Sequence, residues 1–186
     1  MKKILFVILI SAVYTLKLFS QVVSFEKGQI VTKNNDTITA LVELTPTYTG
    51  VVHYKVNPET KIQSIKIKEI NYLKTPYNLF RNIAVKKDDF LFRTVITGKI
   101  TLFEYSKINS GPSSNAYGGT MRYYNPPTII YAVKTNENIF IIKQKKDLIQ
   151  ISSLLDKCSE AKALVDDKTF KLENLKSVID KLNNCN

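Results

Sequence analysis

Apolar and polar residues alternate along much of the chain after residue 28, which is the pattern of half-buried β-strands. The segment GQIVTK is followed by the polar turn residues Asn34, Asn35 and Asp36 and then by TITALVELT, in which every second residue from Ile38 to Leu44 is apolar. This arrangement predicts a hairpin whose second strand has one buried face. The segments GVVHYKV and KIQSIKIKEINYL are rich in β-branched and aromatic residues and predict further strands.

The segment FLFRTVITGKITLFEYSK predicts two strands joined at Gly98-Lys99, because glycine suits the first central position of a two-residue type II′ turn. Phe90 and Phe92 would occupy one face and Leu91 the other, so we expect this pair inside the sheet or beneath a cover. TIIYAVK and IFIIK predict a last hairpin. Residues 75–89 show no clean period, and we expect an irregular connection there that could include a short helix.

Helical periodicity begins near Lys145. Leu148, Ile151 and Leu155 recur at helical spacing, and a second apolar stripe runs through FKLENLKSVIDKLNN. Ser159 is the candidate N-cap of a short middle helix, which polar residues 166–168 interrupt. The expected fold is mainly β with C-terminal α: an antiparallel β-sandwich or partly open barrel over residues 21–144, with a helical tail packed on it over residues 145–186.

The N-terminal segment MKKILFVILISAVYTLKLFS has the layout of a secretory signal peptide over residues 1–20. Lys17 interrupts the apolar run before it reaches the roughly 20 residues that a spanning helix requires. We therefore expect cleavage and no transmembrane anchor afterwards. An uncleaved anchor is the alternative, because a cut before Gln21 places the large Leu18 where small residues are usual.

Export changes how the only two cysteines are interpreted, because disulfides persist in oxidising compartments. Cys158 and Cys185 flank the last helical stretch, and a bond between them would stabilise the tail by about 3 to 4 kcal/mol on the chain-entropy estimate. Two independent thiols are the alternative. A metal site is not expected, because zinc requires about four ligands and the chain has a single histidine.

The net charge of +11 comes mostly from lysine, since the chain has only three arginines. Loss of Lys2, Lys3 and Lys17 with the signal peptide would lower it to +8. Nucleic-acid binding is not expected, because it favours arginine for bidentate contacts. The charge is compatible with an anionic envelope polymer or lipid headgroups, but a solvated, solubilising surface is the simpler explanation.

Recognisable catalytic chemistry is absent from the sequence. No GxSxG, HExxH, GxGxxG or GxxxxGK[ST] motif occurs, and the single histidine, His53, lies within a strand-like run. The adjacent acidic pairs are Asp88-Asp89 and Asp166-Asp167, which we interpret as turn and helix-start residues. Glu43 and Glu104 lie within predicted strands, and the sequence does not say whether they meet. No cofactor is expected.

Residues 108–127 form a long segment of Gly, Ser, Asn, Pro and Tyr without a period, and such loops in compact domains are functional or disordered. Tyr117, Arg122, Tyr123 and Tyr124 are the binding candidates, because such side chains are enriched at interaction hot spots. A loop that binds nothing is the alternative.

The order of segments resembles a known family. GQIVTKNNDTI is similar to the pattern G-x-IV-x-x-NGDTI, FLFRTVITGKITLF is similar to FL-x-x-L-x-x-GKI-x-L, and the cysteine-bounded tail ends in KTFKLENLKSVIDKLNNC. Together these resemble a family of uncharacterised exported β-rich proteins common in Bacteroidota. The resemblance implies an envelope or secreted location and assigns no catalytic residue. The proline common after the first tail cysteine is missing, since Ser159 and Glu160 follow Cys158.

The expected function is that of a non-catalytic binding or structural module of the cell envelope, in the periplasm, at the outer membrane or secreted. Its partner would be an envelope protein or an anionic envelope polymer. The alternative is an envelope hydrolase whose carboxylates converge only in three dimensions. The hydrolase predicts a deep pocket lined by two or more carboxylates, and the binding module predicts a shallow surface near residues 109–127.

Overall fold

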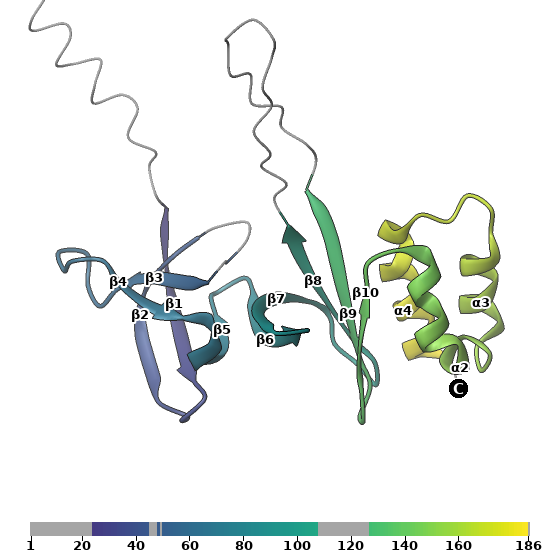
Figure 1. Cartoon of the computed structure of the whole chain (residues 1–186), viewed down its shortest axis with the longest axis horizontal. Coiled ribbons are helices and arrows are strands. Elements are labelled where there is room, and N and C mark those ends of the chain that lie inside the picture. The colour runs from purple at the N-terminus through teal and green to yellow at the C-terminus, as the bar shows by residue number, and fades with distance from the viewer. Residues whose placement is uncertain (1–23, 45–47, 49, 108–126, 186) are drawn as a thin grey trace, which may run out of the picture.

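The computed structural model describes residues 24–44, 48, 50–107 and 127–185, and in these residues a β-sheet is followed by a helical region (Figure 1). The strands are β1 Phe25–Thr32, β2 Thr37–Glu43, β3 Val51–Lys55, β4 Gln63–Lys66, β5 Ile70–Lys74, β6 Leu79–Val85, β7 Asp88–Ile96, β8 Thr101–Lys107, β9 Thr128–Lys134 and β10 Ile139–Ile142. The helical segments are η1 Ile67–Glu69, η2 Lys145–Ile151, α2 Ser152–Leu155, α3 Ser159–Asp166, η3 Leu172–Asn174 and α4 Leu175–Asn184.

The ten described strands form one antiparallel sheet in the order β10-β9-β8-β7-β6-β5-β1-β2-β3-β4. The sheet is open, with β10 and β4 at its edges, and the helices pack beside β8, β9 and β10 (Figure 1). The predicted class, mainly antiparallel β with C-terminal helices, is confirmed. Its strands lie in a single open sheet and not in two stacked sheets.

The expectation of an irregular connection over residues 75–89 is wrong. Most of this segment is strand β6, which pairs with β5 on one side and β7 on the other. Ile83 is buried on one face, while Phe80 contacts the ring of Tyr48 from the other at a centroid distance of 5.3 Å. Because both faces of β6 carry apolar side chains, the strand lacks the alternation by which half-buried strands are recognised.

The expected type II′ turn at Gly98-Lys99 is also wrong. That turn requires a positive φ at its first central residue, and among the described glycines only Gly50 has one, at 73°. The connection between β7 and β8 instead spans residues 97–100. Glycine is needed at position 98 for a different reason: a Cβ there would lie 2.7 Å from the side chain of Asn183 in α4.

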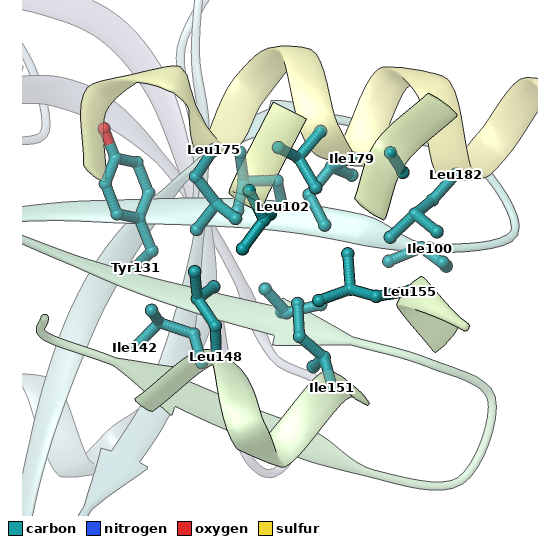
Figure 2. Packing of buried hydrophobic residues seen from close by; sticks show 14 of the residues in the cluster. Ile100, Leu102, Tyr131, Ile142, Leu148, Ile151, Leu155, Leu175, Ile179 and Leu182 are labelled. Atoms are coloured by element: carbon teal, nitrogen blue, oxygen red, sulfur yellow. The ribbon is translucent and has the colours of Figure 1, made fainter. Parts of the chain in front are cut away.

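The largest hydrophobic cluster lies between the helical tail and one face of the sheet, and Figure 2 shows side chains of both converging. The sheet contributes Ile100, Leu102, Tyr131, Val133 and Ile142, and the tail contributes Leu148, Ile151, Leu155, Ala161, Val165, Leu175, Val178, Ile179 and Leu182. The apolar stripes seen in the sequence are therefore the surfaces by which the tail packs. A second cluster, around Ile30, Val42 and Leu73, lies within β1–β5.

The helical segments begin and end close to the predicted positions. The carboxylate of Asp147 accepts hydrogen bonds from the backbone N–H groups of Lys143 and Gln144, at 2.8 and 3.0 Å, and so caps the start of η2. The predicted cap of the middle helix is off by one residue, because Cys158 occupies the N-cap position and Ser159 begins α3. Helix α3 ends at Asp166, where the pattern breaks.

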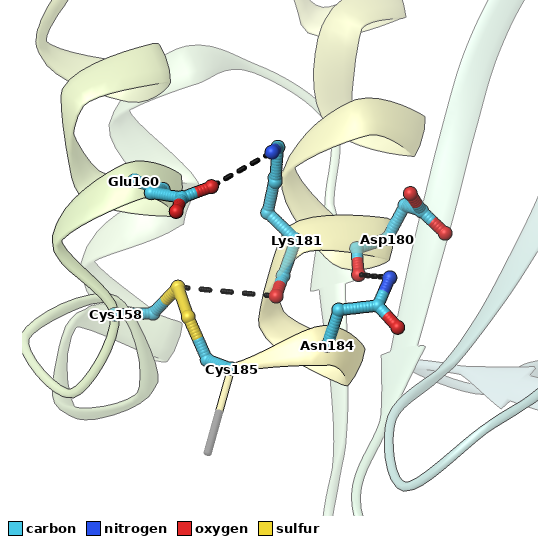
Figure 3. The surroundings of a disulfide bond; sticks show 6 residues. All are labelled: Cys158, Glu160, Asp180, Lys181, Asn184 and Cys185. Atoms are coloured by element: carbon cyan, nitrogen blue, oxygen red, sulfur yellow. Dashed lines mark hydrogen bonds and ion pairs between the residues drawn. A yellow bond between two sulfur atoms is a disulfide. The ribbon is translucent and has the colours of Figure 1, made fainter.

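The predicted disulfide is confirmed: Cys158 and Cys185 are bonded, with their Cα atoms 5.9 Å apart (Figure 3). The bond joins the start of α3 to the end of α4, and α4 packs back against α3. Nearby, Lys181 Nζ lies 2.7 Å from Glu160 Oε2. Both of these side chains are at least half exposed, so this ion pair adds little to stability beside the covalent link.

Polar contacts also fix α4 to the sheet. The side-chain amide of Asn183 pairs with the backbone of Ile100: Nδ2 donates to the carbonyl oxygen at 2.8 Å, and Oδ1 accepts from the backbone N–H at 2.7 Å. At the other end of the helix, Lys176 Nζ lies 3.0 Å from Glu104 Oε2. These contacts hold the tail in one orientation on the sheet.

Candidate functional site

A cleft lies at the end of the sheet where the β7–β8 and β9–β10 connections supply part of its lining. Residues 75–78, 97–100 and 135–138 join β5 to β6, β7 to β8 and β9 to β10, and alternate connections of an antiparallel meander lie at the same end of the sheet. The cleft has a volume of about 580 Å³. It is lined by Asn71, Leu79, Arg81, Asn82, Ile83, Thr94, Thr97, Gly98, Lys99, Thr101, Phe103, Lys134, Thr135, Asn136 and Ile139.

Strand pairing places much of this lining on the face of the sheet opposite the helical tail. Thr101 is paired with Lys134, and Thr94 with Phe103, so each pair projects from one face. Leu102, which lies between Thr101 and Phe103, packs into the cluster beneath the helices. Since successive residues of a strand point to opposite faces, Thr101 and Phe103 face away from the tail.

Three cationic side chains line the cleft: Arg81 is half-buried, and Lys99 and Lys134 are exposed. Within the described residues, the cations that form ion pairs are Lys33, Arg93, Lys162, Lys176 and Lys181. The three cleft cations are therefore not neutralised by a described carboxylate. The guanidinium of Arg81 lies 4.7 Å from the ring centroid of Tyr72, which holds it over an aromatic face and leaves its donors available.

Two lining residues carry a buried oxygen for which the described residues supply no hydrogen-bond partner. Asn82 Nδ2 donates to the carbonyl oxygens of Ile67 and Ile70, at 2.9 and 2.8 Å, which fixes the amide and leaves Oδ1 buried and unpaired. Thr94 Oγ1 is buried and unpaired as well. Unpaired buried polar atoms are rare in folded proteins because they forfeit hydrogen bonds to water.

Hydroxyl and amide groups make up most of the remaining polar lining. Thr94, Thr97, Thr101 and Thr135 supply hydroxyls, and Asn71, Asn82 and Asn136 supply amides. No Asp, Glu, His or Cys is among the described lining residues; Glu137 belongs to the same turn as Asn136 but does not line the cleft. The cleft is thus equipped to attract an anion and to hydrogen-bond neutral polar groups beside it.

The four binding candidates chosen from the sequence, Tyr117, Arg122, Tyr123 and Tyr124, lie outside the described residues. The strands that flank their segment are paired at Lys107 and Thr128, whereas the cleft lies beside the pair Thr101 and Lys134. Six residues of extended strand separate these two positions, or about 20 Å. The cleft is therefore at the other end of β8 and β9 from the predicted binding segment.

The remaining sequence candidates do not assemble into a site. His53 is exposed on β3, opposite Ser64. Asp89 begins β7 with Asp88 and lies 3.5 Å from Lys33, so this pair follows a turn as expected. Asp166 and Asp167 end α3 instead of starting a helix, because the carboxylate of Asp167 accepts a hydrogen bond from the backbone N–H of Thr169 and stabilises the turn that follows.

Glu104 forms ion pairs with two cations, and it has a structural role. It lies in a cross-strand row between Arg93 and Tyr131, with Arg93 bound to Oε1 and Lys176 to Oε2. Burial raises the pKa of Glu104, but hydrogen bonds and charges from the two cations outweigh it, so that the pKa lies below its ordinary value. Burial, together with the charges of Glu104 and Glu173, raises the pKa of Tyr131.

Sequence reasoning did not identify Arg81, Lys99 or Lys134, because residues from six strands and two turns meet only in the folded sheet. In the part of the chain that the structure describes, no three side chains of His, Cys, Asp or Glu gather as metal ligands would. No helix among those residues has the length and apolar character needed to cross a membrane. Comparisons with family models, curated proteins and solved structures find no match to this chain.

Proposed function

We propose that this protein is an exported, non-catalytic binding protein of the cell envelope and that the cleft binds an anionic ligand. The observation that carries the proposal is the composition of the cleft: three cations without carboxylate partners among the described residues, surrounded by threonine and asparagine side chains. A bound carboxylate or phosphate would neutralise this charge.

Electrostatics favours an anion in this position. A concave surface lined by one sign of charge concentrates its field, and a ligand placed there interacts with all three cations. A charge-assisted hydrogen bond contributes about 1.5 to 3 kcal/mol where it is shielded from water, and less at exposed lysines. Arg81 is the least exposed of the three and can donate two parallel hydrogen bonds to one carboxylate, so it would contribute most.

A hydrolytic role finds no comparable support. Hydrolysis by paired acids requires two carboxylates within about 5 to 10 Å across a shared cavity. None of the described residues that line the cleft is an acid, and Glu104 is occupied by two cations on the other face of the sheet. The binding role requires only the groups that are present.

Export is supported by two features that are independent of the cleft. The first twenty residues have the pattern of a signal peptide, and Cys158 and Cys185 form a disulfide of the kind that persists outside the cytosol. We place the protein in the periplasm or at the outer membrane. Cell fractionation combined with mass determination of the purified protein tests this, since a mature chain that retains residues 1–20 would contradict cleavage.

The test of the binding proposal is titration calorimetry with galacturonate and with inorganic phosphate at low salt. Arg81→Gln should weaken binding of whichever anion is preferred by about tenfold or more, equivalent to the loss of one charge-assisted contact. Lys157→Gln removes the same charge from an exposed position before α3 and should change little. Binding that is equally weak in both variants would contradict the cleft as the site.

A further inference from the structure

We infer that the cleft is one part of a longer track and that its ligand is an extended anionic polysaccharide. This inference rests on the proposed function, because it takes the cleft as one of the places where the anionic ligand binds. Its basis is a second hollow of about 310 Å³, lined by Lys27, Gly28, Gln29, Thr39, Lys74, Thr75 and Pro76.

Strand register places the second hollow on the same face as the cleft. Thr39 of β2 is opposite Gln29 of β1, Gln29 is opposite Lys74 of β5, and Lys74 is opposite Leu79 of β6. Paired residues of antiparallel strands project from one face, so this row runs from the second hollow to Leu79, which lines the cleft. Both hollows therefore open on the face that the helical tail does not cover.

The distance involved requires an oligomeric ligand. The sheet order from β2 to β9 passes through β1, β5, β6, β7 and β8, which is six steps between neighbouring strands. At about 4.8 Å for each step, the track is roughly 29 Å long when measured along the sheet. A single sugar ring or a phosphate ion could contact the place where Lys74 and Leu79 are paired, but it could not span the track from Thr39 to Lys134.

The second hollow repeats the chemistry of the first. It has two lysines, Lys27 and Lys74, one amide from Gln29 and two threonines, with no Asp or Glu among its described lining. In both hollows, neutral hydrogen-bonding side chains outnumber the cations. A polymer that carries a carboxylate and several hydroxyl groups on each unit matches this repeated combination of cations with neutral hydrogen-bonding side chains. An acidic polypeptide supplies the carboxylates and lacks the hydroxyls.

The turn between the hollows presents an aromatic ring. Tyr77 is 86% exposed, although it lies in a hydrogen-bonded turn between β5 and β6. The backbone N–H of Thr75 donates to the carbonyl oxygen of Asn78 at 2.8 Å, and the N–H of Asn78 donates to Thr75 Oγ1 at 3.2 Å. Thr75 lines one hollow and Leu79 the other, so a chain that passes between them crosses this turn. A flat amphipathic ring there suits the face of a sugar.

The test measures affinity against ligand length. Galacturonate, trigalacturonate and polygalacturonate are titrated into the full mature protein, with dextran as a neutral polysaccharide and polyglutamate as an acidic chain without hydroxyls. Affinity per galacturonate unit should rise with length, and polygalacturonate should bind at least tenfold more tightly than polyglutamate of equal charge. Dextran should bind weakest. Equal binding of polyglutamate would overturn the assignment of a polysaccharide.

Variants separate the track from general charge attraction. Lys74→Gln and Tyr77→Ala should each weaken polygalacturonate binding by about fivefold to tenfold and leave galacturonate binding unchanged. Lys157→Gln, which removes a charge away from the track, should leave both unchanged; a loss equal to that of Lys74→Gln would overturn the inference. If galacturonate binds the cleft and length adds nothing, the track is wrong and the proposed function stands. If no anion binds, both are wrong.

Discussion

The contact between Gly98 and Asn183 provides a sharp test of how the helical tail is held. Gly98→Ala would place a Cβ 2.7 Å from the Asn183 side chain, well inside van der Waals contact. That side chain cannot move away freely, because its amide makes two hydrogen bonds to the buried backbone of Ile100. We therefore expect alanine at position 98 to break both bonds.

The magnitude follows from the bonds that are lost. Two hydrogen bonds contribute about 1 kcal/mol each, and a buried N–H or C=O left without a partner adds a desolvation cost, so Asn183→Ala should lower the free energy of unfolding by about 2 to 4 kcal/mol. Gly98→Ala should lower it by about 2 kcal/mol through the same loss. Once Asn183 is alanine, the three atoms nearest to the added Cβ are gone, so at a non-positive φ Gly98→Ala should cost far less than it does in the wild type.

The assay is urea unfolding of the wild type, both single variants and the double variant, analysed as a double-mutant cycle. A loss of 2 kcal/mol shifts the unfolding midpoint by about 1 M at an m-value near 2 kcal/mol/M. The cycle should give a coupling free energy of about 2 kcal/mol or more. Additive effects of the two substitutions would refute the contact as the reason for glycine at position 98.

Three further predictions concern the tail and its ion pairs. Replacing both Cys158 and Cys185 by serine should lower the free energy of unfolding by about 3 to 4 kcal/mol, and a reductant should bring the wild type toward the same urea midpoint; an unchanged midpoint would contradict a stabilising disulfide. Ile179→Ala, at a fully buried site of α4, should cost about 2 to 5 kcal/mol, against under about 0.5 kcal/mol for the exposed Ile149→Ala, measured by the same unfolding assay. Because the folded-state pKa of Glu104 is lowered, its stabilising contribution is complete above the unfolded-state pKa and is lost as pH falls through the folded value. Unfolding midpoints of wild type and Glu104→Gln should therefore differ at neutral pH and converge in acid, and a constant difference would exclude this linkage.

Elements with a strong period could be predicted from the sequence. The hairpin predicted from Gly28 onward corresponds to strands β1 and β2. The apolar stripes through Leu148 and Ile179 form the packed faces of the tail. Each of these elements buries one side only, and this gives its sequence a visible period. The disulfide could also be expected, since two cysteines at the ends of one helical stretch allow a single intramolecular pairing.

Features set by contacts distant in the chain could not be predicted. Strand β6 is apolar on both faces, so its period is hidden, and Gly98 is explained by Asn183, a residue 85 positions later. The cleft also depends on contacts distant in the chain: Arg81, Lys99 and Lys134 look like ordinary surface cations in the sequence, and only the folded sheet places them together. The threonine and asparagine residues that line the cleft belong to no sequence motif, so the sequence did not mark them as binding residues.

The most direct test of the proposed binding site is backbone NMR of the mature protein during titration with galacturonate. Amide chemical shifts should change in three segments that are separate in sequence, residues 79–83, 94–101 and 134–139, and these changes should be lost in Arg81→Gln. Changes confined to the residues that flank Lys107 and Thr128, at the other end of β8 and β9, would contradict the cleft as the site.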